Sequence, residues 1–290
     1  MQKVLVTGAS GFIGSNVADE LSERGYKVIL FDVRESRYKR DDQTMIAGDI
    51  LDLDQLIKIT EGVDYVFHFA GIADIGDCAN HPIDTVKCNV LGSVNLLEAC
   101  RINKVKRFIF ASSAYVFSDY GSFYRSSKRA CESFVADYYE RYGLEFTILR
   151  YGSLYGDRSD GKNGLFRLLE GILFNDKFEY EGTGNELREF IHVKDAAIMT
   201  ADSLEETYRN KYFIITGLER LRTKELIELI KEISGRDTAI VYKGQTAMNH
   251  YVVSPYNAKL EEARKIISNT YVDIGQGIVK MIYDIRHAKS

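Results

Sequence analysis

Residues 4–14 read Val-Leu-Val-Thr-Gly-Ala-Ser-Gly-Phe-Ile-Gly. An apolar run, rich in β-branched residues, meets three glycines spaced three apart, and helix-type sequence follows. This order predicts the first turn of a βαβ unit that binds a dinucleotide. Gly8 permits the tight turn, Gly11 lets the backbone approach a pyrophosphate, and Gly14 lets the helix pack close to the strand. Asp32 ends a second predicted strand eighteen residues beyond Gly14, which is the context that this turn requires.

Composition sets limits on the class of protein. A chain of 290 residues can hold one large α/β core and a smaller lobe. A net charge of −4 gives no electrostatic reason to expect nucleic acid. The first predicted strand begins within the first four residues and no apolar run approaches membrane-spanning length, so we expect neither a signal peptide nor a membrane partner.

Cysteine usage indicates a reducing compartment. No Cys-x-x-Cys pair occurs, so we expect buried thiols of a cytoplasmic protein and no metal site. The cysteines are Cys78, Cys88, Cys100 and Cys131.

Strand and helix patterns alternate through the first half of the chain. This alternation predicts a doubly wound parallel sheet of the Rossmann type, covered by helices on both faces. The predicted strands are Val4–Thr7, Lys27–Asp32, Thr44–Ala47, Tyr65–Phe69, Arg107–Ala111 and Glu145–Arg150. The predicted helices are Ile13–Arg24, Leu53–Ile59, Asp84–Ile102 and Phe123–Tyr142.

The pattern loosens after Gly152 and predicts a smaller substrate lobe interleaved with the sheet. Helices are expected over Leu165–Leu173, over Thr223–Ser234, where apolar residues line one face, and near the C-terminus. Phe190–Val193 and Tyr212–Thr216 are expected to be strands that return to the main sheet. The predicted dinucleotide domain is therefore 1–152 with 190–217 returning to it, and 153–189 and 218–290 form the lobe.

Tyr124 and Lys128 have the spacing that places two side chains on one face of a helix. A lysine ammonium near a phenol lowers the phenol pKa from its usual value of about 10, which favours acid/base use near neutral pH. With 19 tyrosines in the chain, one such pair is expected by chance. Its position gives it weight, because Tyr124 follows the fifth predicted strand and begins the next helix.

Ser113 lies at the end of that strand, in Phe-Ile-Phe-Ala-Ser-Ser-Ala-Tyr-Val-Phe at 108–117. The segment resembles the Phe-Ser-Ser-Ser-Ala-x-Val-Tyr stretch of the extended short-chain dehydrogenase/reductases, and residues 7–14 are similar to the glycine turn of the same branch. The resemblance is to the NAD-dependent epimerase/dehydratase family. It implies that Ser113, Tyr124 and Lys128 are catalytic, with Ser113 hydrogen-bonded to the reacting oxygen.

The resemblance covers most of the chain and implies further binding residues. Arg188, in Arg-Glu-Phe-Ile-His-Val, matches an arginine that meets the diphosphate of a nucleotide-sugar, and we count Asn163 with it as substrate-binding. The nearby His192, like His68, is expected to be structural. Implied cofactor contacts, besides the three glycines, Tyr124 and Lys128, are Phe12, Ile13, Asp32, Asp49, Ile50, Phe69, Ala70, Gly71 and Asn89.

Asp32 favours NAD over NADP as the cofactor. A carboxylate at the end of the second strand accepts hydrogen bonds from ribose hydroxyls and repels a 2′-phosphate. Four basic residues that follow it leave NADP open, since they are able to hold a phosphate. These residues are Arg34, Arg37, Lys39 and Arg40.

Two departures from the family pattern bear on the substrate. Dehydratases carry an Asp-Glu pair after the catalytic serine or threonine, whereas Ala114-Tyr115 stands here, so we expect chemistry without loss of water. The connection from Ser113 to Tyr124 is short and Gly152 lacks a side chain, so we expect an open sugar pocket that tolerates bulky groups. The alternative is that residues around 74–81 or 157–163 fill the same space, in which case the selectivity for the sugar is ordinary.

Three functions remain open from the sequence. The first is a nucleotide-sugar epimerase of the C4 type, in which Tyr124 takes a ring-hydroxyl proton while hydride passes to NAD. The second is a nucleotide 4-keto-sugar reductase or dehydrogenase that exchanges its dinucleotide. The third is a non-catalytic dinucleotide sensor, which the presence of Ser113, Tyr124 and Lys128 disfavours.

A homodimer is also expected. The helices Asp84–Ile102 and Phe123–Tyr142 carry apolar faces, and relatives pair these helices with their symmetry mates. Covering their own sheet is the alternative role for these faces. The residues concerned are Val90, Val94, Leu97, Phe134 and Tyr138.

Overall fold

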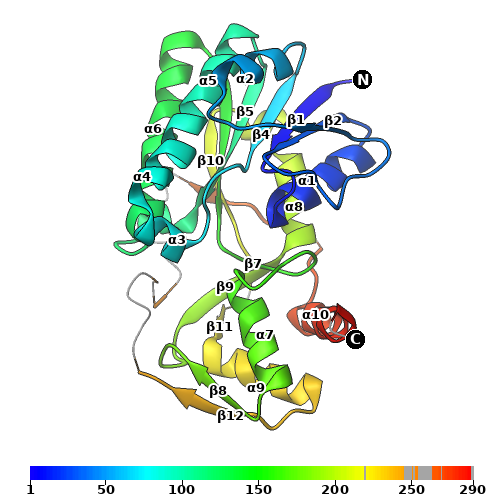
Figure 1. Cartoon of the computed structure of the whole chain (residues 1–290), viewed down its shortest axis with the longest axis vertical. Coiled ribbons are helices and arrows are strands. Elements are labelled where there is room, and N and C mark those ends of the chain that lie inside the picture. Colours follow the sequence, from blue (N-terminus) through cyan, green and yellow to red (C-terminus); the bar gives the residue numbers. More distant parts are fainter. Residues whose placement is uncertain (219, 245–249, 251, 254–262, 269, 289–290) are drawn as a thin grey trace.

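A computed structural model describes residues 1–218, 220–244, 250, 252–253, 263–268 and 270–288. Its centre is an eight-stranded sheet in the order β13-β10-β6-β5-β4-β1-β2-β3, in which every pair of neighbours is parallel (Figure 1). The predicted α/β fold is therefore confirmed. The strands are β1 (Lys3–Thr7), β2 (Lys27–Asp32), β3 (Thr44–Ala47), β4 (Tyr65–His68), β5 (Arg107–Ser113), β6 (Glu145–Tyr151), β10 (Lys211–Ile215) and β13 (Arg264–Lys265).

The strand order reverses between β1 and β4. In an open parallel sheet, such a switch point leaves a crevice at the carboxyl ends of the strands, and ligands bind there. The glycine turn after β1 and the loop after β4 therefore meet where a dinucleotide is expected.

Helices cover both faces of this sheet. Helices α1 (Phe12–Glu23) and α8 (Val193–Asp202) pack on the face that Val4 and Val6 enter. Helices α2 (Leu53–Ile59), α5 (Gly92–Ile102) and α6 (Ser122–Tyr142) pack on the face that Leu5 enters. Because both faces are covered, the central strands bury side chains on both sides.

The helix predicted over Asp84–Ile102 is not regular. Short helices α3 (Ile75–Asn80) and α4 (Pro82–Thr85) lead into a π-helix, η1 (Val86–Leu91), and α5 follows. Such π-helical turns are frequent at functional sites. Two short 3₁₀ turns, η2 (Ala114–Phe117) and η3 (Glu206–Tyr208), follow β5 and α8.

The smaller lobe lies below the main sheet in Figure 1. Helices α7 (Gly164–Phe174), α9 (Thr223–Ser234) and α10 (Ile274–Ala288) share one apolar core. Small sheets join the lobe to the rest: β8 (Lys177–Tyr180) pairs with β12 (Ala239–Tyr242), and β9 (Leu187–His192) lies between β7 (Ser153–Tyr155) and β11 (Arg220–Arg222). The residue limits of the two domains stay a prediction.

One strand prediction is wrong. The sequence predicts Phe190–Val193 in the main sheet, but β9 pairs with β7 and β11 in a separate sheet, whereas the other predicted strand, β10, does join the main sheet, next to β13. The chain leaves β6 at Gly152, where a Cβ would be 2.6 Å from Thr216 Oγ1. β7 follows directly in the separate sheet, and β9 pairs with it there.

Within the described part of the chain, no helix is long and apolar enough to cross a membrane.

Candidate active site

The glycine turn has the close approaches that the sequence predicts. Gly8 has φ +68°, and a Cβ on it would be 2.6 Å from the amide nitrogen of Ala70. A Cβ on Gly14 would overlap the carbonyl oxygen of Gly8. Gly11 caps α1 in extended conformation. The turn, the N-terminus of α1 and the loop after β4 therefore form a cradle that only backbone can line, and a pyrophosphate fits such a cradle.

Asp32 lies beside that turn. Its carboxylate accepts the amide of Ser10 at 3.0 Å and the amide of Arg34 at 3.3 Å. Two of the basic residues that follow Asp32, and that would be able to hold the 2′-phosphate of NADP, have partners within the protein. The Arg40 guanidinium pairs with Glu23 at 3.0 Å, and the Arg37 guanidinium lies over the Tyr38 ring at 4.8 Å. These contacts fit a ribose with free hydroxyls, as in NAD.

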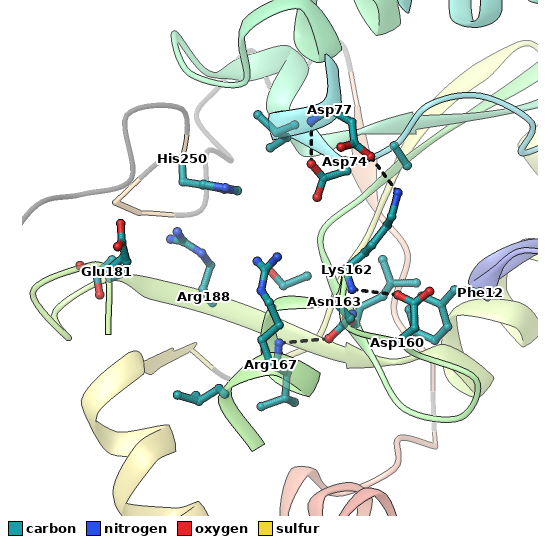
Figure 2. A pocket seen from close by; sticks show the side chains of 18 of the residues that line it. Phe12, Asp74, Asp77, Asp160, Lys162, Asn163, Arg167, Glu181, Arg188 and His250 are labelled. Atoms are coloured by element: carbon teal, nitrogen blue, oxygen red, sulfur yellow. Dashed lines mark hydrogen bonds and ion pairs between the residues drawn. The ribbon is translucent and has the colours of Figure 1, made fainter. Parts of the chain in front are cut away.

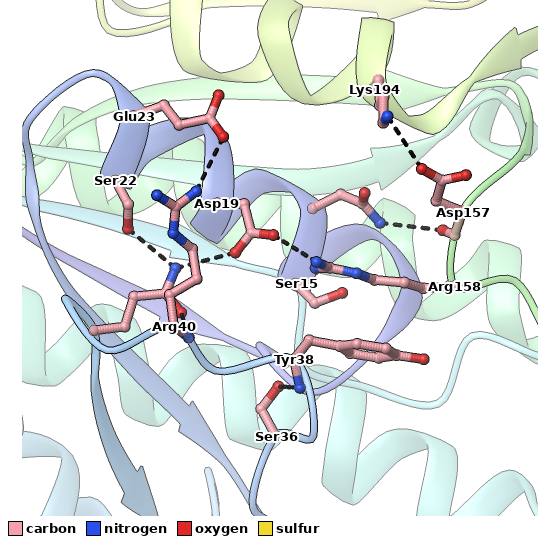
Figure 3. Close-up of polar contacts among 12 residues, drawn as sticks. Ser15, Asp19, Ser22, Glu23, Ser36, Tyr38, Arg40, Asp157, Arg158 and Lys194 are labelled. Atoms are coloured by element: carbon pink, nitrogen blue, oxygen red, sulfur yellow. Dashed lines mark hydrogen bonds and ion pairs between the residues drawn. The ribbon is translucent and has the colours of Figure 1, made fainter.

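Figure 3 shows how the edge of this half is tied to the lobe. Asp19 on α1 binds the Arg158 guanidinium, which also lies over the Tyr38 ring at 4.5 Å. Lys194 binds Asp157 at 3.2 Å. The loop that follows β7 is thus fastened to α1, next to the cofactor cradle.

The loop after β4 is held by Asn89. The Asn89 side chain accepts the amide of Ile72 at 2.7 Å and donates to the Ile72 carbonyl at 3.0 Å. It also donates to Ser127 Oγ at 3.0 Å, and a Cβ on Gly71 would be 2.8 Å from its oxygen. Asn89, predicted as a cofactor contact, therefore lies buried on the π-helix and shapes the Gly71 turn.

The remaining predicted cofactor residues border the same region. Phe12 lines the cleft described below, and Ile13 and Phe69 pack against the apolar core. Asp49 accepts the amide of Leu51 at 2.9 Å, and Ile50 is buried against Gly92 of α5. Their contact with a cofactor stays a prediction.

The predicted catalytic residues come together behind β5. Lys128 Nζ donates to the Ala111 carbonyl at 2.8 Å and lies 5.9 Å from the centre of the Tyr124 ring. Burial lowers the pKa of the Lys128 ammonium. Ser113 Oγ accepts the amide of Tyr115 at 3.3 Å, so Ser113 also caps η2. The sequence spacing therefore places Tyr124 and Lys128 on one face of α6, at the end of the strand that carries Ser113.

A buried ion pair beside these residues was not predicted. Arg150 binds Glu132 through two nitrogens, at 3.0 and 2.7 Å, and Ser112 Oγ donates to the same carboxylate at 2.5 Å. Glu132 lies one turn after Lys128 on α6, and this spacing is the signal that the sequence offers. The pair joins β5, β6 and α6 behind the site.

Two histidines near the site are structural. His68 is buried, and its ring nitrogens hydrogen-bond Thr7 at 2.7 Å and Ser93 at 2.8 Å. Burial, and then the charge of Lys128, lower the pKa of His68 to about 3. His192 caps α8, and burial lowers its pKa to about 4. Both rings are therefore neutral near pH 7.

A cleft of about 1260 Å³ opens between the sheet and the lobe. Figure 2 shows Arg167, Arg188 and His250 lying toward its interior, with Asp74 and Lys162 across from them. Lys162 Nζ binds Asp77 at 2.7 Å and so bridges the lobe and α3.

The two predicted substrate residues have structural contacts of their own. Arg188 Nη1 donates to the carbonyls of Leu187 and Val252, both at 3.2 Å. The Asn163 side chain accepts the amides of Leu165 and Phe166 at the start of α7 and donates to the Leu154 carbonyl. Both residues line the cleft, and substrate contact by either stays a prediction.

The pocket beside Gly152 is not simply open. Tyr115, from η2, packs edge-on against the Tyr124 ring at 6.2 Å, and its hydroxyl hydrogen-bonds His250 Nδ1 at 2.6 Å. In the sequence, Tyr115 is notable only because it stands where a dehydratase carries an acid. The sequence does not predict its hydrogen-bond partner His250, which lies 135 positions away. Tyr115, His250 and Gly152 all line the cleft, and the open sugar pocket stays a prediction.

Comparison with known proteins agrees with this geometry. The sequence profile of the NAD dependent epimerase/dehydratase family matches residues 4–213. A putative UDP-glucose 4-epimerase of Methanocaldococcus jannaschii is 29% identical, over 96% of this chain and 97% of that protein.

Solved structures give the same picture. The UDP-glucose 4-epimerase of Thermotoga maritima, solved with UDP-glucose, has a TM-score of 0.86 at 26% identity and covers 100% of both chains. The UDP-N-acetylglucosamine 4-epimerase of Methanobrevibacter ruminantium has a TM-score of 0.85 at 25% identity and covers 99% of both chains. The predicted family resemblance is thus confirmed, and with it NAD as the cofactor. This chain belongs to the NAD-dependent epimerase/dehydratase family.

Proposed function

We propose that this protein is an epimerase that inverts C4 of a UDP-linked sugar. The observation that supports this most is on α6 and η2: Lys128 lies 5.9 Å from the centre of the Tyr124 ring, and Tyr115, which packs against that ring, lines the cleft together with Arg167 and Arg188. The names of the relatives supply the UDP part of the proposal.

The roles of the residues follow from their positions. Bound in the cradle, NAD supplies a hydride acceptor that returns the hydride later. Tyr124 takes the proton of the C4 hydroxyl, and Ser113 hydrogen-bonds the same oxygen as it becomes a carbonyl. The Lys128 ammonium, held by the Ala111 carbonyl, favours the anionic form of the phenol.

Inversion then needs the keto-sugar to present its other face. A cleft of about 1260 Å³ exceeds the volume of most small-ligand pockets, so a hexose has room to turn while its diphosphate stays bound. Arg188 lines the same cleft, and its proposed role is to hold that diphosphate during the turn.

The test is incubation of the purified protein with UDP-glucose and UDP-galactose, followed by proton NMR and mass analysis. Interconversion at unchanged mass supports the proposal. A product changed by two daltons favours the keto-sugar reductase instead, and a product lighter by one water contradicts the interpretation of Ala114-Tyr115.

We also propose a homodimer formed through η1 and α6, which pack against each other. Leu97 is fully buried in its own core and is a wrong choice of interface residue. Val86, Leu91, Phe123 and Phe134 are large apolar side chains that are exposed here, and such a patch marks an interaction surface. Sedimentation at micromolar concentration tests the dimer, and a monomer only would contradict it.

The cytoplasm is the proposed location. All four cysteines are free thiols, which suits a reducing compartment. Fractionation of cells that produce the protein at native level tests this.

A further inference from the structure

Arg167 is a charge in the cleft that the proposed catalytic steps do not use. It lies in the first turn of α7, just after the Asn163 cap, and its exposed side chain points into the cleft in Figure 2. Within the described residues, its guanidinium has no hydrogen bond or ion pair. An arginine placed so keeps its full capacity to bind an anion.

His250 lies on the same side of the cleft. It is half-buried, and its Nδ1 is taken by the Tyr115 hydroxyl at 2.6 Å. Burial, followed by the charges of Arg188 and Arg167, lowers the pKa of His250, while Asp74 acts in the opposite direction. Both guanidinium groups are therefore close enough to act on the imidazole.

Three acids that line the cleft have contacts of their own and do not pair with Arg167. Asp77 binds Lys162 at 2.7 Å, Asp74 accepts the Asp77 amide at 2.8 Å, and Glu186 accepts the Thr183 amide at 2.7 Å. The charge of Arg167 is thus left for a ligand.

We propose that Arg167 and His250 form an oxyanion-binding subsite, placed by the Tyr115 hydrogen bond next to the catalytic Tyr124. The oxyanion is part of the nucleotide-sugar, so the inference rests on the proposed function. This oxyanion is either the diphosphate or a carboxylate on the sugar. A guanidinium binds both groups in the same way, through two parallel N–H···O hydrogen bonds.

The subsite also has a consequence for the sugar end. Tyr115 touches the ring of Tyr124 on one side and His250 on the other. An oxyanion held at Arg167 and His250 therefore fixes the distance between the reacting carbon and the charged group of the substrate.

The experiment is calorimetric titration of the NAD-loaded protein with UDP, UDP-glucose and UDP-glucuronic acid. Arg167→Gln removes the charge, and Arg167→Lys keeps it. Lys58→Gln is the matched control, because it removes one exposed positive charge on α2, away from the cleft. We expect Arg167→Gln to weaken binding about tenfold or more, and the Lys variant to weaken it less.

The ligands separate the two sources. If Arg167→Gln lowers the affinity for all three ligands equally, then Arg167 binds the diphosphate. If it lowers only the affinity for UDP-glucuronic acid, then Arg167 binds a carboxylate on the sugar. His250→Gln is expected to weaken the same ligands. Unchanged affinity of Arg167→Gln for all three overturns the subsite, as does a wild-type protein that binds none of them. A wild-type protein that binds UDP but converts no UDP-sugar instead overturns the proposed function and leaves the subsite standing.

Discussion

The dinucleotide half and the substrate lobe build their binding surfaces differently. The first uses backbone: Gly8, Gly11 and Gly14 leave no side chain between the turn and its neighbours, and all lie within one short stretch. The second uses side chains from distant parts of the chain. Tyr115 meets His250, and Lys162 meets Asp77 across 85 positions.

This difference teaches where sequence patterns carry information. A binding surface lined by backbone requires glycine at particular spacings, so it can be predicted from one stretch of sequence. A side-chain site requires only that suitable groups meet in space. The proposed catalytic residues lie in the first half, and the proposed diphosphate-binding residues lie in the second. We therefore expect substitutions in the two halves to differ in kind.

The largest effect is expected at Tyr124. Tyr124→Phe removes the proposed proton carrier and keeps the ring, so turnover should fall about 10²–10⁴-fold while NAD binding stays nearly intact. The measurements are the rate of UDP-sugar interconversion and the NAD content of the purified protein.

Tyr283→Phe on α10 is the matched control, since that ring is 60% exposed and lies in the lobe. Activity of Tyr124→Phe within severalfold of wild type would contradict the assignment of the proton carrier.

A second large effect is expected behind the site. Glu132→Gln keeps the shape of the side chain but leaves the Arg150 guanidinium, which is 6% exposed, without its counter-charge. Removing one partner of a buried pair should lower the free energy of unfolding by about 3 kcal/mol. Urea unfolding measures it.

Glu98→Gln is the control, because the side chains of Arg101 and Glu98 are 36% and 29% exposed and a smaller loss is expected there. If both variants lose the same stability, then the buried pair has no special role in holding β5, β6 and α6 together.

The sequence predicts the sheet, the glycine turn and the Tyr124–Lys128 pair because each depends on local spacing. It does not predict the sheet to which β9 belongs, since its partners β7 and β11 are set by tertiary pairing and not by the apolar pattern of β9 itself. It does not predict the π-helix either, because the apolar pattern of residues 84–102 suits any helix. The His250 partner of Tyr115 is beyond such reasoning, since no periodicity connects η2 with the end of the lobe.

Acid should weaken the dinucleotide half through its buried histidine. The pKa of His68 is about 3 in the folded state and about 6.5 in an unfolded chain, so only the unfolded state binds the proton between these values. The free energy of unfolding should therefore fall as pH drops below about 6.5, by about 1.4 kcal/mol per pH unit for one histidine. His192, with a pKa of about 4, adds to the slope.

Urea unfolding at pH 7.5 and 5.5 measures this slope. His68→Asn should reduce this slope by the contribution of about one proton. His81→Asn, at an exposed position, is the control and should leave the slope as in the wild type. A His68 variant with the wild-type slope would place the acid sensitivity elsewhere.

The smallest effect is expected where the two halves meet at the mouth of the cleft. The bridge between Lys162 and Asp77 joins them at 2.7 Å, but the side chains are 70% and 48% exposed. Water and salt screen such a pair, so Lys162→Gln should change kcat/KM for the UDP-sugar by less than about threefold. The rate should be measured at low and at high salt, because a screened bridge loses its influence as salt rises. A tenfold loss of kcat/KM that persists in high salt would show instead that the bridge holds the cleft closed over the sugar. The lobe would then depend on one side-chain contact between distant residues as strongly as the dinucleotide half depends on its glycines.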